Sequence, residues 1–253
     1  VEKAGLPKYL PVLRRMATFE MGRAIVATVL HESTGVIEPV DRISILPRGD
    51  EMTRTIFARA DEENYTLATK KRLIARLQVI LAGRAAEEIM YGSANSSTLS
   101  EDDLQDATTL SRRIVTNYGL ADDLQLSTFL ETAPTYRTSS GVYGTWKKFT
   151  GMLEGQDTDG IDGRDHIQPA ASTLDASRDK TNTLLMEAYS ANLETLREYT
   201  DAIKAGVEVT LVNHQISGNQ IRAIIQEHPA KPIEGAVEPE FAKYDMQAPE
   251  YAY

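Results

Sequence analysis

The amino-acid sequence predicts a mainly α-helical fold that includes a small antiparallel β-hairpin or sheet. Long segments carry apolar residues at helical spacing, and two short segments alternate with period two on either side of a Pro-Arg-Gly-Asp turn. Of the 253 residues, 42% are hydrophobic, which is enough for an ordinary core in one large or two small domains. Helices therefore account for most of the expected structure.

The first helix is expected over residues 11–32, because Pro11 suits the first helical position and an apolar segment follows it. A turn-rich connector is expected at 36–40. Residues 42–46 and 53–60 alternate in polarity, which predicts that they pair as antiparallel strands.

Two more helices are expected in the middle of the chain. Residues 66–91 carry a long apolar stripe, and Gly92 is a suitable stop. Ser100 is a good N-cap for the next helix, and Asp103 at its third position resembles the acidic partner of a capping box. This helix is expected to end near Tyr118.

The C-terminal part of the chain predicts further helices. One helix is expected over 173–203. Gly206 is expected to interrupt it, and residues 207–212 follow as a short apolar segment. Ser217 is expected to cap a last helix over 221–227.

These elements divide the chain into four segments. Residues 1–130 are expected to form a helical core with the small sheet, and 171–228 to add the C-terminal helices of the same domain. Residues 131–170 are rich in Gly, Thr, Ser and Asp, which predicts a long loop or insertion. Residues 229–253 mix Pro, acidic residues and Tyr without periodicity, which predicts an extended or disordered tail.

Composition excludes several classes of protein. The chain has 27 Lys+Arg against 37 Asp+Glu, and this formal net charge of −10 argues against general nucleic-acid binding. It has no cysteine, which excludes disulfide scaffolds, thiolate zinc sites and cysteine nucleophiles. Its most nearly apolar stretch, 24–30, is far shorter than the roughly 20 residues that span a bilayer. Because the chain begins at Val1 without a Met or a signal-like stretch, we expect a fragment or a processed product.

Two common kinds of site are missing from the sequence. Neither a G-x-x-x-x-G-K-[ST] phosphate loop nor a G-x-G-x-x-G fingerprint occurs, so the chain has no recognisable nucleotide site. No two histidines have the i, i+4 spacing that lets one helix hold zinc with two imidazoles. The histidines, which we expect to be ordinary surface or capping residues, are His31, His166, His214 and His228.

The segment 17–27, which reads ATFEMGRAIVA, resembles the zinc helix of the FtsH family of membrane-anchored, ATP-dependent metalloproteases. In that family the pattern is H-E-x-G-H-A. Further segments resemble motifs of the family in the right order and at plausible spacing, and the likeness implies an FtsH-type peptidase domain. These segments are SILPRG at 44–49, LAGRAAEE at 81–88, the run from Ser97 to Thr108, and YGL at 118–120.

The resemblance carries four site positions over to this chain. In the family two histidines and an aspartate hold zinc, and a glutamate is the general base; here Phe19 and Arg23 stand at the histidine positions, Asp103 at the aspartate and Glu20 at the base. Phenylalanine has no lone pair, and arginine is always protonated, so neither can bind zinc. The resemblance therefore implies a degenerate site without a metal, in which Glu20 is a relic of the base.

Loss of zinc would leave Glu20 and Asp103 close together without a cation. Arg23 can neutralise part of this charge, because a guanidinium matches carboxylate geometry and helical spacing places it beside Glu20. We therefore expect an Arg23–Asp103 or Arg23–Glu20 ion pair, with Phe19 filling the rest of the former pocket. Without the resemblance, the same residues would be a surface ion pair and the first-turn charge of a helix.

The resemblance implies a proteolytically inactive, FtsH-like subunit, similar to the inactive FtsH-like proteins of plastids. Its partners would be other FtsH-like subunits in a hetero-hexameric, membrane-anchored, ATP-driven ring, together with protein cargo or import machinery. ATP would bind in an upstream domain, and the membrane anchor would also lie outside these residues. The location would be the stromal side of the chloroplast inner envelope or of the thylakoid membrane.

Two alternatives stay open. One is an active ATP-dependent metalloendopeptidase with unusual zinc ligands. The other is a stand-alone helical adaptor domain.

Overall fold

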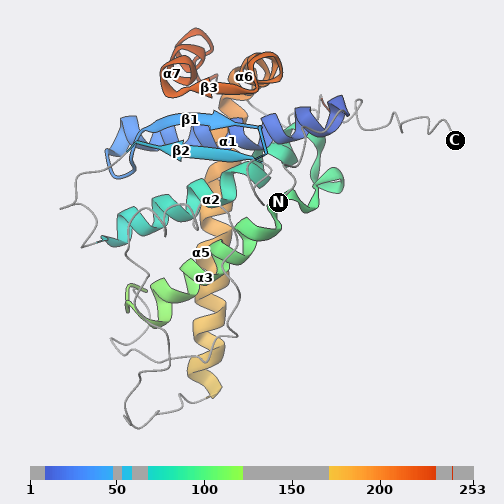
Figure 1. The fold of residues 1–253 in the computed structure, drawn as a ribbon. Helices are drawn as coiled ribbons and strands as arrows, with labels where there is room; N and C mark the ends of the chain where they lie inside the picture. The colour runs from blue at the N-terminus through green and yellow to red at the C-terminus, as the bar shows by residue number, and fades with distance from the viewer. Residues whose placement is uncertain (1–8, 48–52, 59–67, 122–170, 232–240, 242–253) are drawn as a thin grey trace, which may run out of the picture.

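The fold is mainly helical with one small sheet, as the sequence predicts (Figure 1). The computed structural model describes residues 9–47, 53–58, 68–121, 171–231 and Phe241. The predicted loop or insertion at 131–170 lies outside the described residues. The helices are α1 (Leu10–Thr34), α2 (Lys70–Tyr91), α3 (Glu101–Thr116), α5 (Ala171–Glu198), α6 (Thr200–Asn213) and α7 (Gly218–Glu227), the strands are β1 (Val40–Ser44), β2 (Arg54–Phe57) and β3 (Gln215–Ser217), and two 3₁₀ turns are η2 (Ser93–Asn95) and η3 (Thr98–Ser100).

Helix α1 is the central element of the fold. Every residue from Met16 to Thr28 is buried, so this part of the helix has no solvent face, as expected for a helix packed on all sides. Pro11 stands in its first turn, and Gly35 ends it with a φ of 63°. The predicted first helix therefore forms and is slightly longer at both ends.

Helix α2 packs very closely against α1. At Gly22 of α1, a Cβ atom would lie 2.3 Å from the Ala86 Cβ and 3.0 Å from the Ala82 carbonyl oxygen. Only glycine permits this approach of the two helices. The Thr69 side chain caps the start of α2, and Gly92 ends the helix with a φ of 86°, as the sequence predicts.

The three strands form one antiparallel sheet with β1 between β2 and β3. Ile43 of β1 lies opposite Thr55 of β2 and Ile216 of β3. Figure 1 shows β1 and β2 lying along α1, with α6 and α7 beside β3. The pairing of β1 with β2 was predicted from alternation, whereas β3 is too short to show a pattern.

The prediction that Gly206 interrupts the preceding helix is wrong. Helix α5 ends just before Tyr199, and α6 continues through Gly206, so residues 207–212 are helical. Gly206 serves packing instead, because a Cβ atom there would lie 2.2 Å from the Met21 Cε of α1. Its hydrogen side chain lets α6 approach the central helix.

The capping interaction expected at the start of α3 does not form. Ser100 precedes the helix, but its side chain makes no cap hydrogen bond, and its Oγ accepts a hydrogen bond of 3.2 Å from Arg84 Nη1. Asp103 binds Arg23 of α1 instead. A buried guanidinium competes successfully for this carboxylate, because an uncompensated charge in the interior is very costly. Helix α3 also ends slightly earlier than predicted.

The last helix is capped as predicted, and one residue of the C-terminal tail packs on the fold. Ser217 caps α7 through a reciprocal capping box with Gln220. Most of the tail over 229–253, which we expect to be extended or disordered, lies outside the described residues; within it Phe241 is 4% exposed. Its N–H donates a hydrogen bond of 2.8 Å to the Met90 carbonyl, because burying the ring anchors the backbone beside α2.

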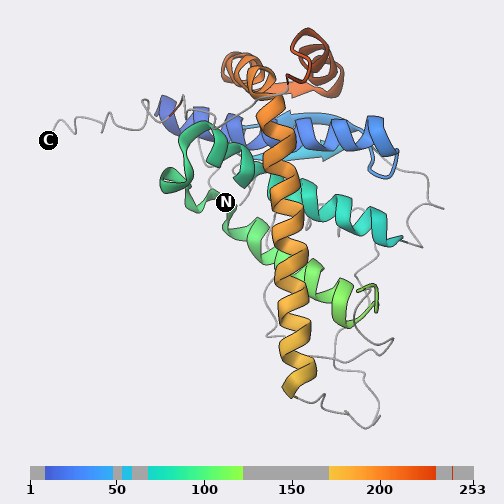
Figure 2. The ribbon, with the colours of Figure 1, turned by 180° about the vertical axis from the view of Figure 1, so that it is seen from behind.

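The helices and the sheet enclose two apolar clusters. One lies among α1, α2, α6, α7 and the sheet, and the other lies where α5 packs against α2 and α3. Figure 2 shows α5 as a long helix that crosses in front of both partners of the second cluster. None of the helices in the described part of the chain combines the length and the apolar character that crossing a bilayer requires.

Candidate functional site

A buried cluster of charges forms where α1 meets the start of α3. Arg23 Nη1 donates a hydrogen bond of 2.9 Å to Glu20 Oε1, one helical turn earlier on α1. Arg23 Nη2 donates to Asp103 Oδ2 on α3. Glu20, Arg23 and Asp103 are 0%, 4% and 3% exposed, so these contacts form away from solvent. The guanidinium that we expected beside one acid therefore bridges both.

The sheet also contributes to this cluster. The Thr55 hydroxyl on β2 donates a hydrogen bond to Glu20 Oε2. Both carboxylate oxygens of Glu20 are thus engaged, one by Arg23 and the other by Thr55. Among the described residues, Asp103 Oδ1 has no hydrogen-bond partner. Glu20 is consequently held in one orientation, whereas Asp103 keeps one buried lone-pair site to which a proton can bind.

Phe19 fills the space beside the guanidinium. The Cζ atom of Arg23 lies 4.6 Å from the centroid of the Phe19 ring, which is cation–π geometry. On the side that faces α2, the Phe19 ring packs against Gly83. A Cβ atom at position 83 would lie 2.6 Å from Phe19 Cε1. The ring therefore takes the room that a larger residue at position 83 would need.

The electrostatics of the cluster reflect one cation facing two acids. Burial opposes the charge of Arg23, but the attraction of Asp103 and Glu20 outweighs it and raises the pKa of the guanidinium. Burial raises the pKa of the Asp103 carboxyl to about 6, and Arg23 offsets only part of this effect. Arg23 thus stays protonated, and the Asp103 carboxyl gains a proton at a higher pH than an ordinary aspartate does.

Replacing Asp103 with asparagine should remove a defined part of the pH dependence of stability. Because the pKa of Asp103 is about 6 in the folded state and about 3.9 in an unfolded chain, the folded state binds more protons between these values. The free energy of unfolding therefore falls as pH rises from about 4 to 6, by up to about 3 kcal/mol from this residue. Urea denaturation between pH 4 and 7 should show that loss in the parent and not in Asp103→Asn.

The exposed neighbour Asp102 is the matched control for this change. Asp102→Asn should keep most of the parent's pH profile, because its exposed carboxyl is the smallest of the named contributions to the raised pKa of Asp103. Superimposable profiles for the parent and Asp103→Asn would contradict the assignment of the proton to Asp103.

The residues at this site do not fit a zinc ion. Zinc needs neutral imidazole, thiolate or carboxylate ligands, and the two histidine positions of the FtsH pattern hold a phenyl ring and a guanidinium. The guanidinium lies between the two carboxylates that a metal would need. In the described part of the chain, no group of three His, Asp or Glu side chains is arranged to hold a metal ion.

Sequence reasoning missed two residues that shape the site. Thr55 was placed only in a strand, and nothing in a hairpin pattern says which residue of an outer strand reaches a buried glutamate. Gly83 lies in the segment that resembles a family motif, but its contact with the Phe19 ring depends on how α2 crosses α1. Neither contact can be predicted from residues that are close together in the sequence.

A buried glutamate on a central helix, joined through Arg23 to an aspartate from a later helix, is the arrangement that the FtsH pattern predicts for a zinc-peptidase type of domain. The chain belongs to peptidase family M41, whose family model matches residues 13–150, more than half of its length. This match confirms the FtsH-type peptidase fold that the sequence motifs predict.

The relatives include one protein named as probably inactive and others named as ATP-dependent zinc metalloproteases. The chain is 33% identical over 218 residues to the Arabidopsis thaliana protein named "Probable inactive ATP-dependent zinc metalloprotease FTSHI 1, chloroplastic", covering 85% of this chain and 22% of that protein. It is 27% identical to the ATP-dependent zinc metalloprotease FtsH of Thermotoga maritima, over 87% of this chain and 32% of the relative. It is 29% identical to the chloroplastic ATP-dependent zinc metalloprotease FTSH 2 of Oryza sativa, over 88% of this chain and 29% of the relative.

The chain spans between a fifth and a third of the length of these relatives.

Proposed function

We propose that this chain is the peptidase-type domain of a proteolytically inactive FtsH-like subunit. The observation that carries the proposal is the position of Arg23, whose guanidinium bridges Glu20 and Asp103 in the interior. A permanent cation that cannot act as a ligand replaces the metal between these acids.

The chemistry of the site supports a loss of peptide hydrolysis. In a zinc peptidase the metal lowers the pKa of bound water and polarises the scissile carbonyl. Here Glu20 has both oxygens engaged, by Arg23 and by Thr55, so neither is directed at a water molecule. A carboxylate alone cannot supply the Lewis acid that the reaction needs. The relative whose name contains the word inactive is consistent with this proposal.

We further propose that the domain works inside a hetero-hexameric, ATP-driven ring anchored in a membrane of the chloroplast. The names of the relatives support parts of this assignment, since they describe ATP-dependent proteins and several are chloroplastic. ATP would bind in a part of the subunit outside this chain, and the other subunits would be FtsH-like. The role would be to handle protein cargo during import or translocation without cleaving it.

Two other functions make different predictions. An active metalloendopeptidase with unusual ligands would carry zinc and would lose cleavage when Glu20 is changed. A stand-alone adaptor domain would occur without an ATPase in the same polypeptide.

A glutamine at position 20 should leave proteolysis unchanged. The test uses the native complex that contains this subunit, with ATP and an unfolded protein such as casein as substrate. Because Glu20 activates no water in the proposed state, the Glu20→Gln complex should degrade casein at the parental rate. The matched control changes the general base of an FtsH-like partner subunit, which should abolish any cleavage that the complex performs.

Zinc content and subunit mass complete this test. We expect no zinc bound by this subunit in elemental analysis, and native mass spectrometry should show a longer polypeptide with ATPase-bearing partners. Stoichiometric zinc in the subunit together with loss of cleavage in Glu20→Gln would establish the active alternative. A lone chain without an ATPase would favour the adaptor.

A further inference from the structure

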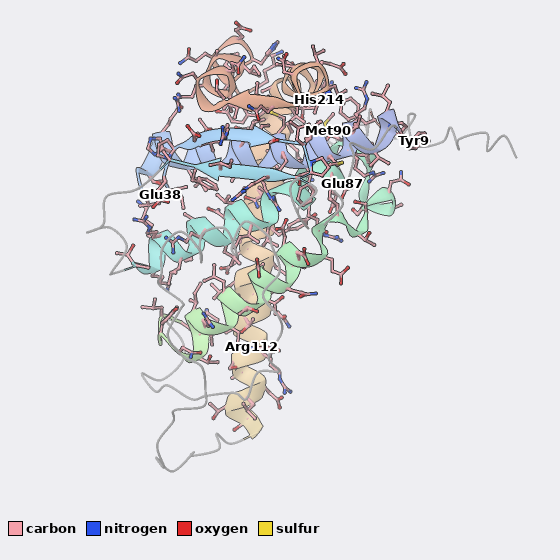
Figure 3. The ribbon with its side chains drawn as sticks, viewed as in Figure 1. Tyr9, Glu38, Glu87, Met90, Arg112 and His214 are labelled. Atoms are coloured by element: carbon pink, nitrogen blue, oxygen red, sulfur yellow. The ribbon has the colours of Figure 1, made fainter. Side chains whose placement is uncertain are left out.

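Phe241 occupies a socket formed by Arg14 of α1 and by Met90 and Tyr91 at the end of α2, which we call the aromatic socket. Its ring meets the Tyr91 ring edge to face, with 5.7 Å between centroids and an interplanar angle of 61°. The Cζ atom of Arg14 lies 5.4 Å from the Phe241 centroid. The Phe241 N–H donates to the Met90 carbonyl at 2.8 Å, so backbone and side chain are both recognised. Figure 3 labels Met90 and Glu87, which lie on this end of α2.

The contacts in the aromatic socket suit an aromatic residue of a peptide segment. An edge-to-face ring pair and a cation near the ring select for an aromatic side chain, and the Met90 carbonyl accepts from any non-proline backbone. Arg14 pairs with Glu208 and Arg15 with Glu87, so the positive charge beside the socket is already balanced. The ring contacts and the Met90 carbonyl therefore select the occupant.

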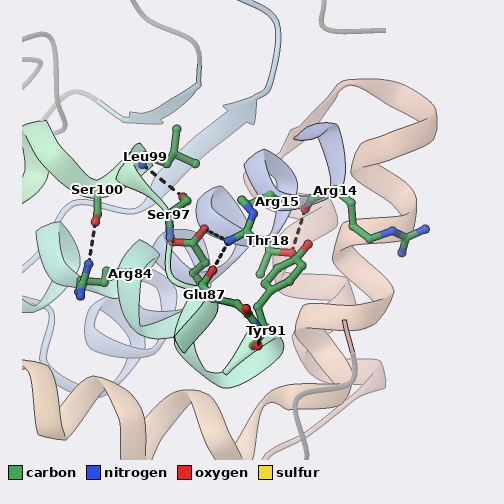
Figure 4. Close-up of polar contacts among 10 residues, drawn as sticks. Arg14, Arg15, Thr18, Arg84, Glu87, Tyr91, Ser97, Leu99 and Ser100 are labelled. Carbon is green, nitrogen blue, oxygen red and sulfur yellow. Dashed lines mark hydrogen bonds and ion pairs between the residues drawn. The ribbon is translucent and has the colours of Figure 1, made fainter. Parts of the chain in front are cut away.

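The aromatic socket is linked to a polar network that leads toward α3 (Figure 4). The Arg15 guanidinium lies over the Tyr91 ring, with 4.3 Å from Cζ to the centroid. Arg15 Nη1 donates to Glu87 Oε1 at 2.5 Å and to the Asn95 carbonyl at 2.7 Å. Glu87 Oε2 in turn accepts from the Ser97 N–H at 3.1 Å.

This network holds the turns that precede α3. Glu87 is fully buried, and it fixes the Ser97 backbone just before η3. The Ser97 hydroxyl accepts from the Leu99 N–H at 3.2 Å, and Ser100 follows, bonded to Arg84. Helix α3 begins at the next residue and carries Asp103 of the buried charge cluster.

We propose that the aromatic socket is a binding site for an aromatic residue of a peptide segment, that the chain's own Phe241 fills it, and that its occupation holds the η2–η3 turns in place. Removing the Phe241 ring takes away one packing partner of the Tyr91 ring. The Arg15 guanidinium lies over that same Tyr91 ring. Arg15 then holds Glu87 less firmly, and the turns that lead into α3 open more often. Phe241 acts as an anchor whose packing stabilises the start of α3.

The experiment uses the complete 253-residue chain with Phe241→Ala and a fluorescent peptide spanning residues 232–253 as the probe. The amide of Ser97 should exchange with deuterium at least about tenfold faster in Phe241→Ala than in the parent. The probe should bind Phe241→Ala saturably in fluorescence anisotropy and return Ser97 exchange to the parental rate. It should bind the parent at least about tenfold more weakly, since Phe241 competes for the aromatic socket.

Matched changes make the result specific. A probe with Phe241→Ala should fail to bind, and Tyr244→Ala in the full chain should leave Ser97 exchange unchanged. Circular dichroism checks that Phe241→Ala keeps its helical content. Absence of probe binding, binding that does not depend on the Phe241 ring, or unchanged Ser97 exchange would each overturn the proposal.

Discussion

Replacing Arg23 with methionine should lower the free energy of unfolding by about 3–5 kcal/mol at pH 7. Methionine keeps much of the length and the apolar stem of arginine, so the change mainly removes the cation. Glu20 and Asp103 would then remain buried without a positive partner. Breaking a buried ion pair from one side leaves uncompensated charge, which is far more destabilising than losing an exposed pair. Urea denaturation of the parent and Arg23→Met measures the difference.

Two controls separate charge from packing in this experiment. Arg178→Met on α5 removes an arginine whose side chain is 63% exposed, and it should change stability by no more than about 0.5 kcal/mol. The triple change Glu20→Gln, Arg23→Met and Asp103→Asn removes the acids with the cation and should regain most of the lost stability. The cost of Arg23→Met should also be smaller near pH 5, because the raised pKa of Asp103 lets it become neutral there. A cost below about 1 kcal/mol at pH 7 would mean that Arg23 does not compensate these acids.

Restoring histidine at both altered positions should create a zinc site. In the double variant Phe19→His, Arg23→His the two imidazoles stand four residues apart on one face of α1, near Asp103 of α3. Two histidines and one carboxylate are a sufficient protein ligand set for zinc with an open fourth position. We expect one zinc per chain by equilibrium dialysis and elemental analysis, and none in the parent. Zinc at about 100 times its Kd should stabilise the variant by about 2.7 kcal/mol, and a chelator should reverse this gain.

The single variant Phe19→His is the first control for the zinc experiment. It keeps the guanidinium between Glu20 and Asp103 and should bind no zinc. Adding Asp103→Asn to the double variant removes one ligand and should weaken zinc binding at least about tenfold. A folded double variant that fails to bind zinc would show that the ligand positions inferred from the FtsH pattern do not meet in this chain.

Much of the fold was predicted because its signals are local. The apolar spacing in α1 and α2, the glycine at position 92 and the capping box at Ser217 each depend on neighbours within a few residues. The Arg23–Glu20 contact belongs to the same class, since three-residue spacing places both side chains on one face of a helix. These are properties that one segment carries by itself.

The errors share a different physical origin. From the local sequence, Gly206 is expected to interrupt a helix. In the structure it lies within α6, at the point where α6 approaches Met21 of α1. Ser100 and Asp103 have the spacing of a cap, but a buried arginine from another helix binds the carboxylate. In each case a long-range contact outweighs a weak local preference.

The sequence by itself determined the helical class, the likeness to the FtsH family and the presence of Phe and Arg at the two histidine positions of the FtsH pattern, because these are properties of residue type and spacing. The tertiary structure alone decided that one guanidinium bridges both acids, that Thr55 takes the second oxygen of Glu20, and that Phe241 is anchored at the end of α2. Those contacts join residues far apart in the chain. Their energies depend on burial and close packing, which exist only after the helices have assembled.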